Sequence, residues 1–167
     1  MHETCGFVSP QTTIKMFRKQ PLSKEKALSR LAALCAKAEY CTGDMEDKMR
    51  RWGLDAEAIR ENIDYLVGHQ YIDNVRYCKA FVNDKIACNH WGRRKIEQAL
   101  WMKHIPESVS VPVLDAVPQE VYVRVLRPLL DANRPTIKAE SDYERQMKLI
   151  KFALGRGFDL DEIKLCL

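Results

Sequence analysis

Apolar side chains recur every three or four positions along most of the 167-residue chain, with charged residues between them. After Ser23, for example, Leu28, Leu31 and Cys35 follow at this spacing. Such a period places apolar side chains on one face of a helix, which can then pack against a neighbouring helix. The pattern predicts an all-α fold.

Residues that cap helices divide this pattern into nine predicted helices. Ser23, Thr42 and Asp55 each stand before an apolar-periodic segment, where their side chains can accept hydrogen bonds from free backbone N–H groups. Gly53 ends the second of these helices. Pro112 should kink or shorten the helix in which it lies. The six further helices are predicted at residues 73 to about 89, 92 to about 103, 107 to about 117, 119–133, about 139–154, and 159 to the end.

The predicted helices form three similar groups of three. Leu54, Ile105 and Phe158 stand just after the second helix of each group, and they are 51 and 53 residues apart. Repeats of about 50 residues are the natural interpretation. Apolar residues recur nine before, five before and nine after these positions: Met45, Ile96 and Leu149; Met49, Leu100 and Ala153; Ile63, Leu114 and Leu167.

A repeat of this size has too little apolar surface to fold stably alone, so neighbouring repeats must share contacts. We therefore expect an elongated array, able to curve, of tandem three-helix repeats at residues 22–70, 71–117 and 118–167. Residues 1–21 are expected to form a flexible basic arm. Such a shape suits binding along an extended partner.

Composition is that of a folded globular protein, with 46% hydrophobic and 30% charged residues. No run approaches the roughly 20 apolar residues of a membrane span, and the N-terminus lacks the pattern of a secretory signal. We expect a cytoplasmic protein with no membrane contact. The six cysteines include no C-x-x-C pair, and Cys88 and His90 lack a second ligand pair, so neither metal nor cofactor is expected.

Positive charge gathers in the middle of the chain. Residues 76–104 include seven basic and two acidic side chains, whereas residues 31–75 include five basic and nine acidic ones. Basic side chains on short helices can bind DNA phosphates or acidic patches of a protein. The simpler alternative is a solvated face without a partner. The candidate binding residues are Arg76, Lys79, Lys85, Arg93, Arg94, Lys95 and Lys103.

The tryptophans allow two interpretations. Trp91, beside two arginines, could stack on a nucleobase, but we favour packing against a neighbouring helix. Trp52 and Trp101, late in equivalent helices, are predicted to mark packing between repeats. No phosphate-binding glycine-rich loop is present in the sequence, and no histidine has a nucleophilic partner that the sequence can orient. We expect a protein without enzymatic activity.

Two motifs of the middle repeat resemble the RecX family of regulatory proteins. The likeness extends from about residue 22 to residue 167, is looser in the first repeat, and is weakest in the third, whose connection NRPTIKAESD is long. The motifs are Asp73, Arg76, Tyr77, Ala80, Phe81 and Val82 in one helix, then Trp91-Gly92-Arg93-Arg94-Lys95-Ile96 with Leu100, Lys103 and Ile105 in the next.

The resemblance implies tandem three-helix repeats and a non-enzymatic regulator, which we expect to be a monomer. Its expected partner is the filament that RecA recombinase forms on DNA, with single- or double-stranded DNA contacted as part of the filament. RecA ATP hydrolysis and strand exchange would then be inhibited. Two alternatives stay open: a helical module that binds DNA without RecA, and a docking scaffold for other proteins.

Overall fold

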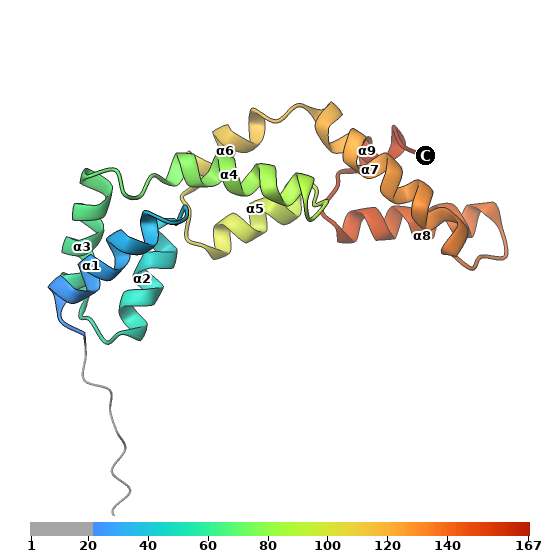
Figure 1. Ribbon diagram of the computed structural model, residues 1–167. Coiled ribbons are helices and arrows are strands. Elements are labelled where there is room, and N and C mark those ends of the chain that lie inside the picture. Colours follow the sequence, from blue (N-terminus) through green and yellow to red (C-terminus); the bar gives the residue numbers. More distant parts are fainter. Residues whose placement is uncertain (1–21) are drawn as a thin grey trace, which may run out of the picture.

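The computed structural model describes residues 22–167, and the arm predicted at residues 1–21 lies outside them. The described residues form nine α-helices and one short 3-10 helix and include no β-strand (Figure 1), so the all-α prediction is confirmed. In chain order the elements are α1 (Lys24–Cys35), α2 (Thr42–Arg51), α3 (Ala56–Gly68), α4 (Asn74–Ala87), α5 (Arg93–Met102), α6 (Glu107–Asp115), α7 (Gln119–Asn133), η1 (Arg134–Thr136), α8 (Asp142–Gly155) and α9 (Leu160–Lys164).

The helices follow one another along an elongated, curved array (Figure 1). We refer to α1–α3, α4–α6 and α7–α9 as the first, middle and last trios. The first trio lies at one end, the middle trio at the centre and the last trio at the other end. The predicted array of three-helix units is thus the observed architecture, while the exact repeat boundaries stay a prediction.

Each trio turns the same corner after its second helix. The residue after the corner donates its N–H to the carbonyl five positions earlier, at 3.1–3.2 Å. The residue before it has a left-handed backbone, with φ between 57° and 87°. This pairing is the Schellman ending of a helix, and its repetition explains why the sequence patterns of the three trios align. The three corners are Gly53-Leu54, His104-Ile105 and Gly157-Phe158.

Most predicted caps are confirmed, with one correction. Ser23 and Asp55 accept hydrogen bonds from backbone N–H groups in the first turns of α1 and α3, as predicted. Asp73, predicted as the first residue of its helix, is instead the N-cap of α4. The prediction for Thr42 is wrong, because α2 begins at Thr42 itself. Cys41 is the N-cap, and its Sγ lies 3.4 Å from the N–H of the third helical residue. The thiol fills the place that a hydroxyl or carboxylate usually takes.

The last trio departs from the others in its second helix. α2 and α5 begin 12 residues before Leu54 and Ile105, whereas α8 begins 16 residues before Phe158. Helix α8 therefore has one extra turn at its N-terminus. Its predicted start near residue 139 was three residues too early, because Ser141 is the N-cap. Arg145, in that extra part of α8, stands where α2 and α5 have their N-caps.

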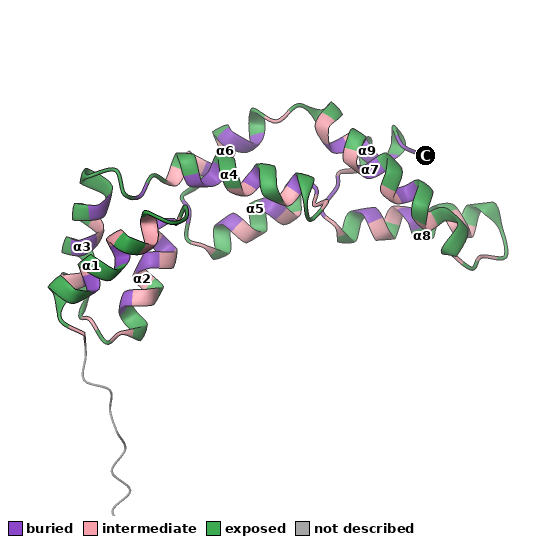
Figure 2. Ribbon diagram, viewed as in Figure 1, coloured by how far each residue is buried: buried purple, intermediate pink, exposed green. Residues whose placement is uncertain are grey.

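Buried residues occur in all three trios (purple in Figure 2). Their side chains form two separate clusters. The first trio has its own cluster around Met45, Met49 and Leu66. The middle and last trios share the second cluster, which continues from α4 to the end of α9. Cys41 is the one buried side chain of the first trio in that second cluster. The middle and last trios therefore form one apolar body, to which the first trio is attached through a smaller contact.

No described helix is both long enough and apolar enough to cross a bilayer. Helix α6, which contains Pro112, is nine residues long and is the shortest helix of the middle trio.

Candidate partner-binding surface

The second helices of the three trios lie end to end along the array (Figure 1). The C-terminus of α8 contacts the N-terminus of α5, and the C-terminus of α5 contacts the N-terminus of α2. At each contact the partly negative end of one helix dipole meets the partly positive end of the next. We call these contacts the α5–α8 joint and the α2–α5 joint.

The α5–α8 joint is a close contact between backbones. The N–H of Gly92 donates to the carbonyl of Arg156 at 2.9 Å, and the N–H of Arg94 donates to the carbonyl of Gly157 at 3.1 Å. A Cβ on Gly92 would overlap the Gly157 carbonyl group, so this position needs a glycine. Arg94 also places its Nε 2.5 Å from a carboxylate oxygen of Asp159. The Trp91-Gly92 segment that precedes the basic residues Arg93 to Lys95 is thus also the point where two trios meet.

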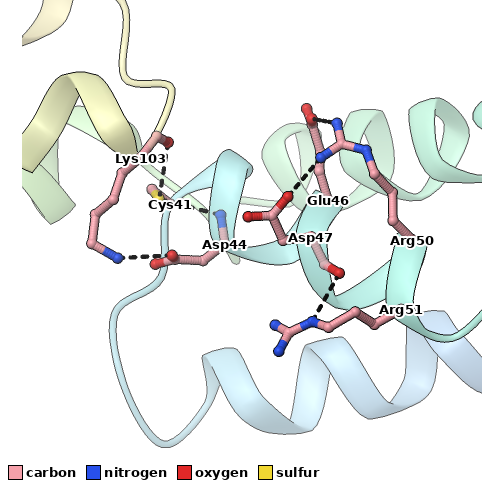
Figure 3. A network of polar contacts seen from close by, with 7 residues as sticks. All are labelled: Cys41, Asp44, Glu46, Asp47, Arg50, Arg51 and Lys103. Carbon is pink, nitrogen blue, oxygen red and sulfur yellow. Dashed lines mark hydrogen bonds and ion pairs between the residues drawn. The ribbon is translucent and has the colours of Figure 1, made fainter.

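The α2–α5 joint is more polar (Figure 3). The Cys41 thiol donates to the carbonyl of Lys103 at 3.8 Å, and the Lys103 ammonium lies 2.8 Å from the Asp44 carboxylate. A Cβ on Gly43 would overlap the same Lys103 carbonyl, so the backbones are again in close contact. On the exposed side of α2, Figure 3 shows Arg50 paired with neighbouring carboxylates of its own helix, away from the joint.

Two further pairs attach the first trio to α4. The N–H of Thr42 donates to the Asn74 side-chain oxygen, and the Asn74 amide donates to the Thr42 hydroxyl, both at 3.1 Å. Arg76 Nε lies 2.6 Å from Glu39 Oε1. Because Arg76 and Lys103 both pair with carboxylates of the first trio, these two candidate residues connect trios in the observed structure.

In each trio, the carbonyl of the residue that precedes the left-handed residue of the corner accepts a hydrogen bond. At the two joints the donor is the N-cap residue of α5 or of α2, and in the first trio it is the residue that leads into α1. In this way the incoming chain takes the place of a preceding repeat. The three pairs are Gly92 with Arg156, Cys41 with Lys103, and Leu22 with Trp52 at 3.1 Å.

Burial and charge set the ionisation states at the α2–α5 joint. Burial acts to lower the pKa of Lys103, but the contacts with Asp44 and Tyr77 outweigh it and raise that pKa above its ordinary value. Burial raises the pKa of Tyr77 to about 12 and that of Cys41 to about 11. At neutral pH the joint therefore contains a charged lysine beside a neutral phenol and a neutral thiol. A thiol held neutral in this way is a packing group and not a nucleophile.

The remaining candidate residues lie in different places. Arg93 pairs with Asp115 of α6 at 2.5 Å. Lys85 and Lys95 are brought together on the indole of Trp91, with ammonium-to-centroid distances of 5.7 and 4.8 Å. Trp91 packs against the second core cluster, as expected. Such cation–π contacts contribute about 0.5–1 kcal/mol each when exposed.

Lys79 is exposed on α4 and, like Lys95, forms no ion pair within residues 22–167. The seven candidates thus do not form one continuous surface. Four of them, at positions 76, 93, 94 and 103, pair with carboxylates of other helices or connections. The role of all seven in binding stays a prediction.

The prediction that Trp101 marks packing between repeats is wrong. Its exposed fraction is 70%, and that of its neighbour Met102 is 66%, whereas Trp52 packs half-buried against the first cluster. Aligning the sequence at Leu54 and Ile105 could have revealed the exposure of Trp101. Trp101 stands four residues before Ile105, and the residue four before Leu54 is the exposed Arg50. Trp52 stands only two residues before Leu54, so the two tryptophans are not equivalent.

No three His, Cys, Asp or Glu side chains in the described part of the chain are grouped closely enough to bind a metal ion.

Comparison with known proteins decides the family. The model of the family described as RecX, second three-helix domain, matches residues 73–110, from the start of α4 into α6. A regulatory protein RecX from Clostridium botulinum (strain Alaska E43 / Type E3) is 32% identical over 122 residues, which cover 72% of this chain and 57% of that protein. One from Vibrio campbellii (strain ATCC BAA-1116) is 27% identical over 145 residues, which cover 87% of this chain and 89% of that protein. The chain belongs to the RecX family.

Solved RecX structures have the same fold. The crystal structure of RecX from Lactobacillus salivarius matches with a TM-score of 0.78 at 20% identity, over 86% of this chain and 93% of that one. A second RecX crystal structure matches with a TM-score of 0.79 at 22% identity, over 86% of this chain and 72% of that one. The RecX relatives are named regulatory proteins. The chain spans 57% of the length of the Clostridium relative.

Proposed function

We propose that this RecX protein binds the RecA nucleoprotein filament and inhibits its ATP hydrolysis and strand exchange. The observation that carries the proposal is the curved array of three trios, which offers an extended surface to an extended partner (Figure 1). The positive charge of the middle trio supports the same function, because a filament contains DNA phosphates along its whole length. The contact is non-enzymatic and needs no cofactor.

The basic residues that are free of ion pairs provide the sharpest test. Lys79→Glu/Lys95→Glu reverses two charges without breaking a carboxylate pair, whereas reversing Arg93 or Arg94 would also break contacts with Asp115 or Asp159. The double variant should fold, bind RecA filaments more weakly, and lose inhibition of RecA ATP hydrolysis. If each lysine contacts one phosphate, the slope of log affinity against log salt concentration should become shallower by about two.

The matched control is Lys26→Glu/Lys151→Glu, which changes the net charge equally at exposed positions of the first and last trios. Co-sedimentation with filaments, bare single-stranded DNA and bare duplex compares the partners directly. Full inhibition by Lys79→Glu/Lys95→Glu would exclude these lysines from the contact. Binding to bare duplex as tight as binding to filaments would instead favour a DNA-binding module that acts without RecA.

A further inference from the structure

The exposed indole of Trp101 borders a hollow on α5 and α6. Arg94, Glu97 and Trp101 lie at helical spacing along one face of α5, and Glu107 faces them from the start of α6. A large aromatic side chain that is 70% exposed removes little apolar surface from water in the free protein. Its contact area becomes useful only when a partner covers it.

The charges around this hollow select the chemistry of its occupant. Glu97 and Glu107 form no ion pair within residues 22–167, whereas Arg94 is already paired with Asp159. The free charges beside the indole are therefore two carboxylates. Carboxylates repel phosphate, which argues against base stacking of nucleic acid at this position. They attract a cation.

We propose that this hollow binds an arginine side chain of a protein partner. A guanidinium can stack on the indole face of Trp101 while its N–H groups donate to Glu97 and Glu107. Met102, which follows Trp101 on α5, is also 66% exposed. The surface assigns a protein-contacting role to α5 that is separate from the lysines around Trp91. It rests on the proposed function only in naming the RecA filament as the partner.

The first test uses a peptide and needs no RecA. Acetylated, amidated Arg-Leu-Arg is titrated into the full chain while the indole N–H signals of Trp52, Trp91 and Trp101 are followed by NMR, each assigned with a Trp→Phe variant. The Trp101 signal should shift in a saturable way, while the other two stay in place. Gln-Leu-Gln should cause no shift, and Glu97→Gln/Glu107→Gln should weaken binding of the arginine peptide about tenfold.

The second test uses RecA filaments. Trp101→Ala should bind filaments about tenfold more weakly and bind bare single-stranded DNA as the unchanged protein does. Tyr143→Ala is the matched control, because Tyr143 is 73% exposed on α8 and should leave both affinities unchanged. Both variants should fold, since both side chains lie mostly in water.

The outcomes separate this inference from the proposed function. A Trp101 signal that ignores the arginine peptide, or moves equally with a thymidine decamer, overturns the inference. So does a self-association that Trp101→Ala abolishes in sedimentation velocity, because the hollow would then bind a second copy of the chain. If the unchanged protein does not sediment with filaments, the proposed function fails, while the peptide titration still decides what the hollow binds.

Discussion

His104 has a backbone conformation that is costly for any residue with a side chain, with φ of 57°. The two equivalent corners have glycine at this position, at Gly53 and Gly157. Left-handed geometry costs an L-residue about 1–2 kcal/mol, and the greater freedom of glycine in the unfolded chain offsets part of that. His104→Gly should therefore stabilise the protein by about 0.5–1 kcal/mol in urea unfolding. A loss of stability would show that the histidine makes contacts that outweigh its strain.

Glu162 is a nearly fully buried carboxylate, with 4% of its surface exposed. Burial is the main cause that raises its pKa, although the hydrogen bond from the Asp159 N–H at 2.8 Å favours the charged form. A raised pKa means that the folded state binds this proton more tightly than the unfolded chain. The contribution of Glu162 to stability therefore improves as the pH falls through the raised pKa toward the ordinary value of 4.5.

Glu162→Gln removes that dependence while keeping an acceptor for the Asp159 N–H. The variant should be more stable than the unchanged protein at pH 7, and the difference should shrink as the pH is lowered toward 4.5. Urea midpoints measured across this range check the result, with Glu140→Gln as an exposed control. If the stability advantage of Glu162→Gln instead grew as the pH fell, the raised pKa of Glu162 would be contradicted.

Individual caps and core positions follow from local sequence, whereas solvent exposure at a helix end does not. Ser23 and Asp55 were predictable as caps because each bonds within its own first turn. Cys41 was not, since Thr42 is the commoner cap and its hydroxyl is instead paired with Asn74, 32 residues away. Trp101 misleads because a large apolar side chain is usually buried, and only the corner alignment places it off the packed face.

At the scale of elements, Gly92 decides whether α5 can meet α8. Its backbone is unstrained, so a substitution tests only the space at the joint. Gly92→Ala should force the Gly157 carbonyl away and destabilise the protein by about 1–3 kcal/mol. Hydrogen exchange should rise at the N–H groups of residues 92 and 94, whose acceptors lie across the joint.

Gly155→Ala is the control for that variant. Nothing lies within 4 Å of a Cβ placed at Gly155, which ends α8. Since alanine favours a helix over glycine, this change should stabilise the protein by about 0.5–1 kcal/mol. Equal effects of the two substitutions on stability would show that the joint has no special need for glycine.

Nine helices could be predicted because their apolar period and most of their caps are local signals. The joints could not, because their partners are 62 residues apart for Cys41 and Lys103 and 65 apart for Arg94 and Asp159. This separation explains the main revision of the candidate site. A basic run in sequence gives no sign that some of its members are neutralised by distant carboxylates, so charge alone overstated the free surface.

At the scale of the whole molecule, the two core clusters predict unequal stability along the array. Leu66→Ala removes a fully buried side chain from the first cluster, and Leu126→Ala removes one from the second. Each should cost about 2–5 kcal/mol in the part that contains it. Hydrogen exchange followed by mass spectrometry should show Leu66→Ala speeding exchange in α1–α3 alone, because the α2–α5 joint is small and polar.

Leu126→Ala should speed exchange throughout α4–α9, since these helices share one cluster. Uniform acceleration over all nine helices by either variant would mean that the protein unfolds as a single cooperative unit, and that the polar joint couples the trios as strongly as an apolar core.

The joints between second helices bring two different surfaces of similar units together. Contacts of that kind can add units without limit and produce open fibres unless something ends them. Here the N–H of Leu22 donates to the carbonyl of Trp52, which a further unit would otherwise use. At the other end, the extra turn of α8 stands at the position where a further unit would attach. The two outer ends of the described array therefore differ from its inner joints, and we expect that molecules do not join end to end through them.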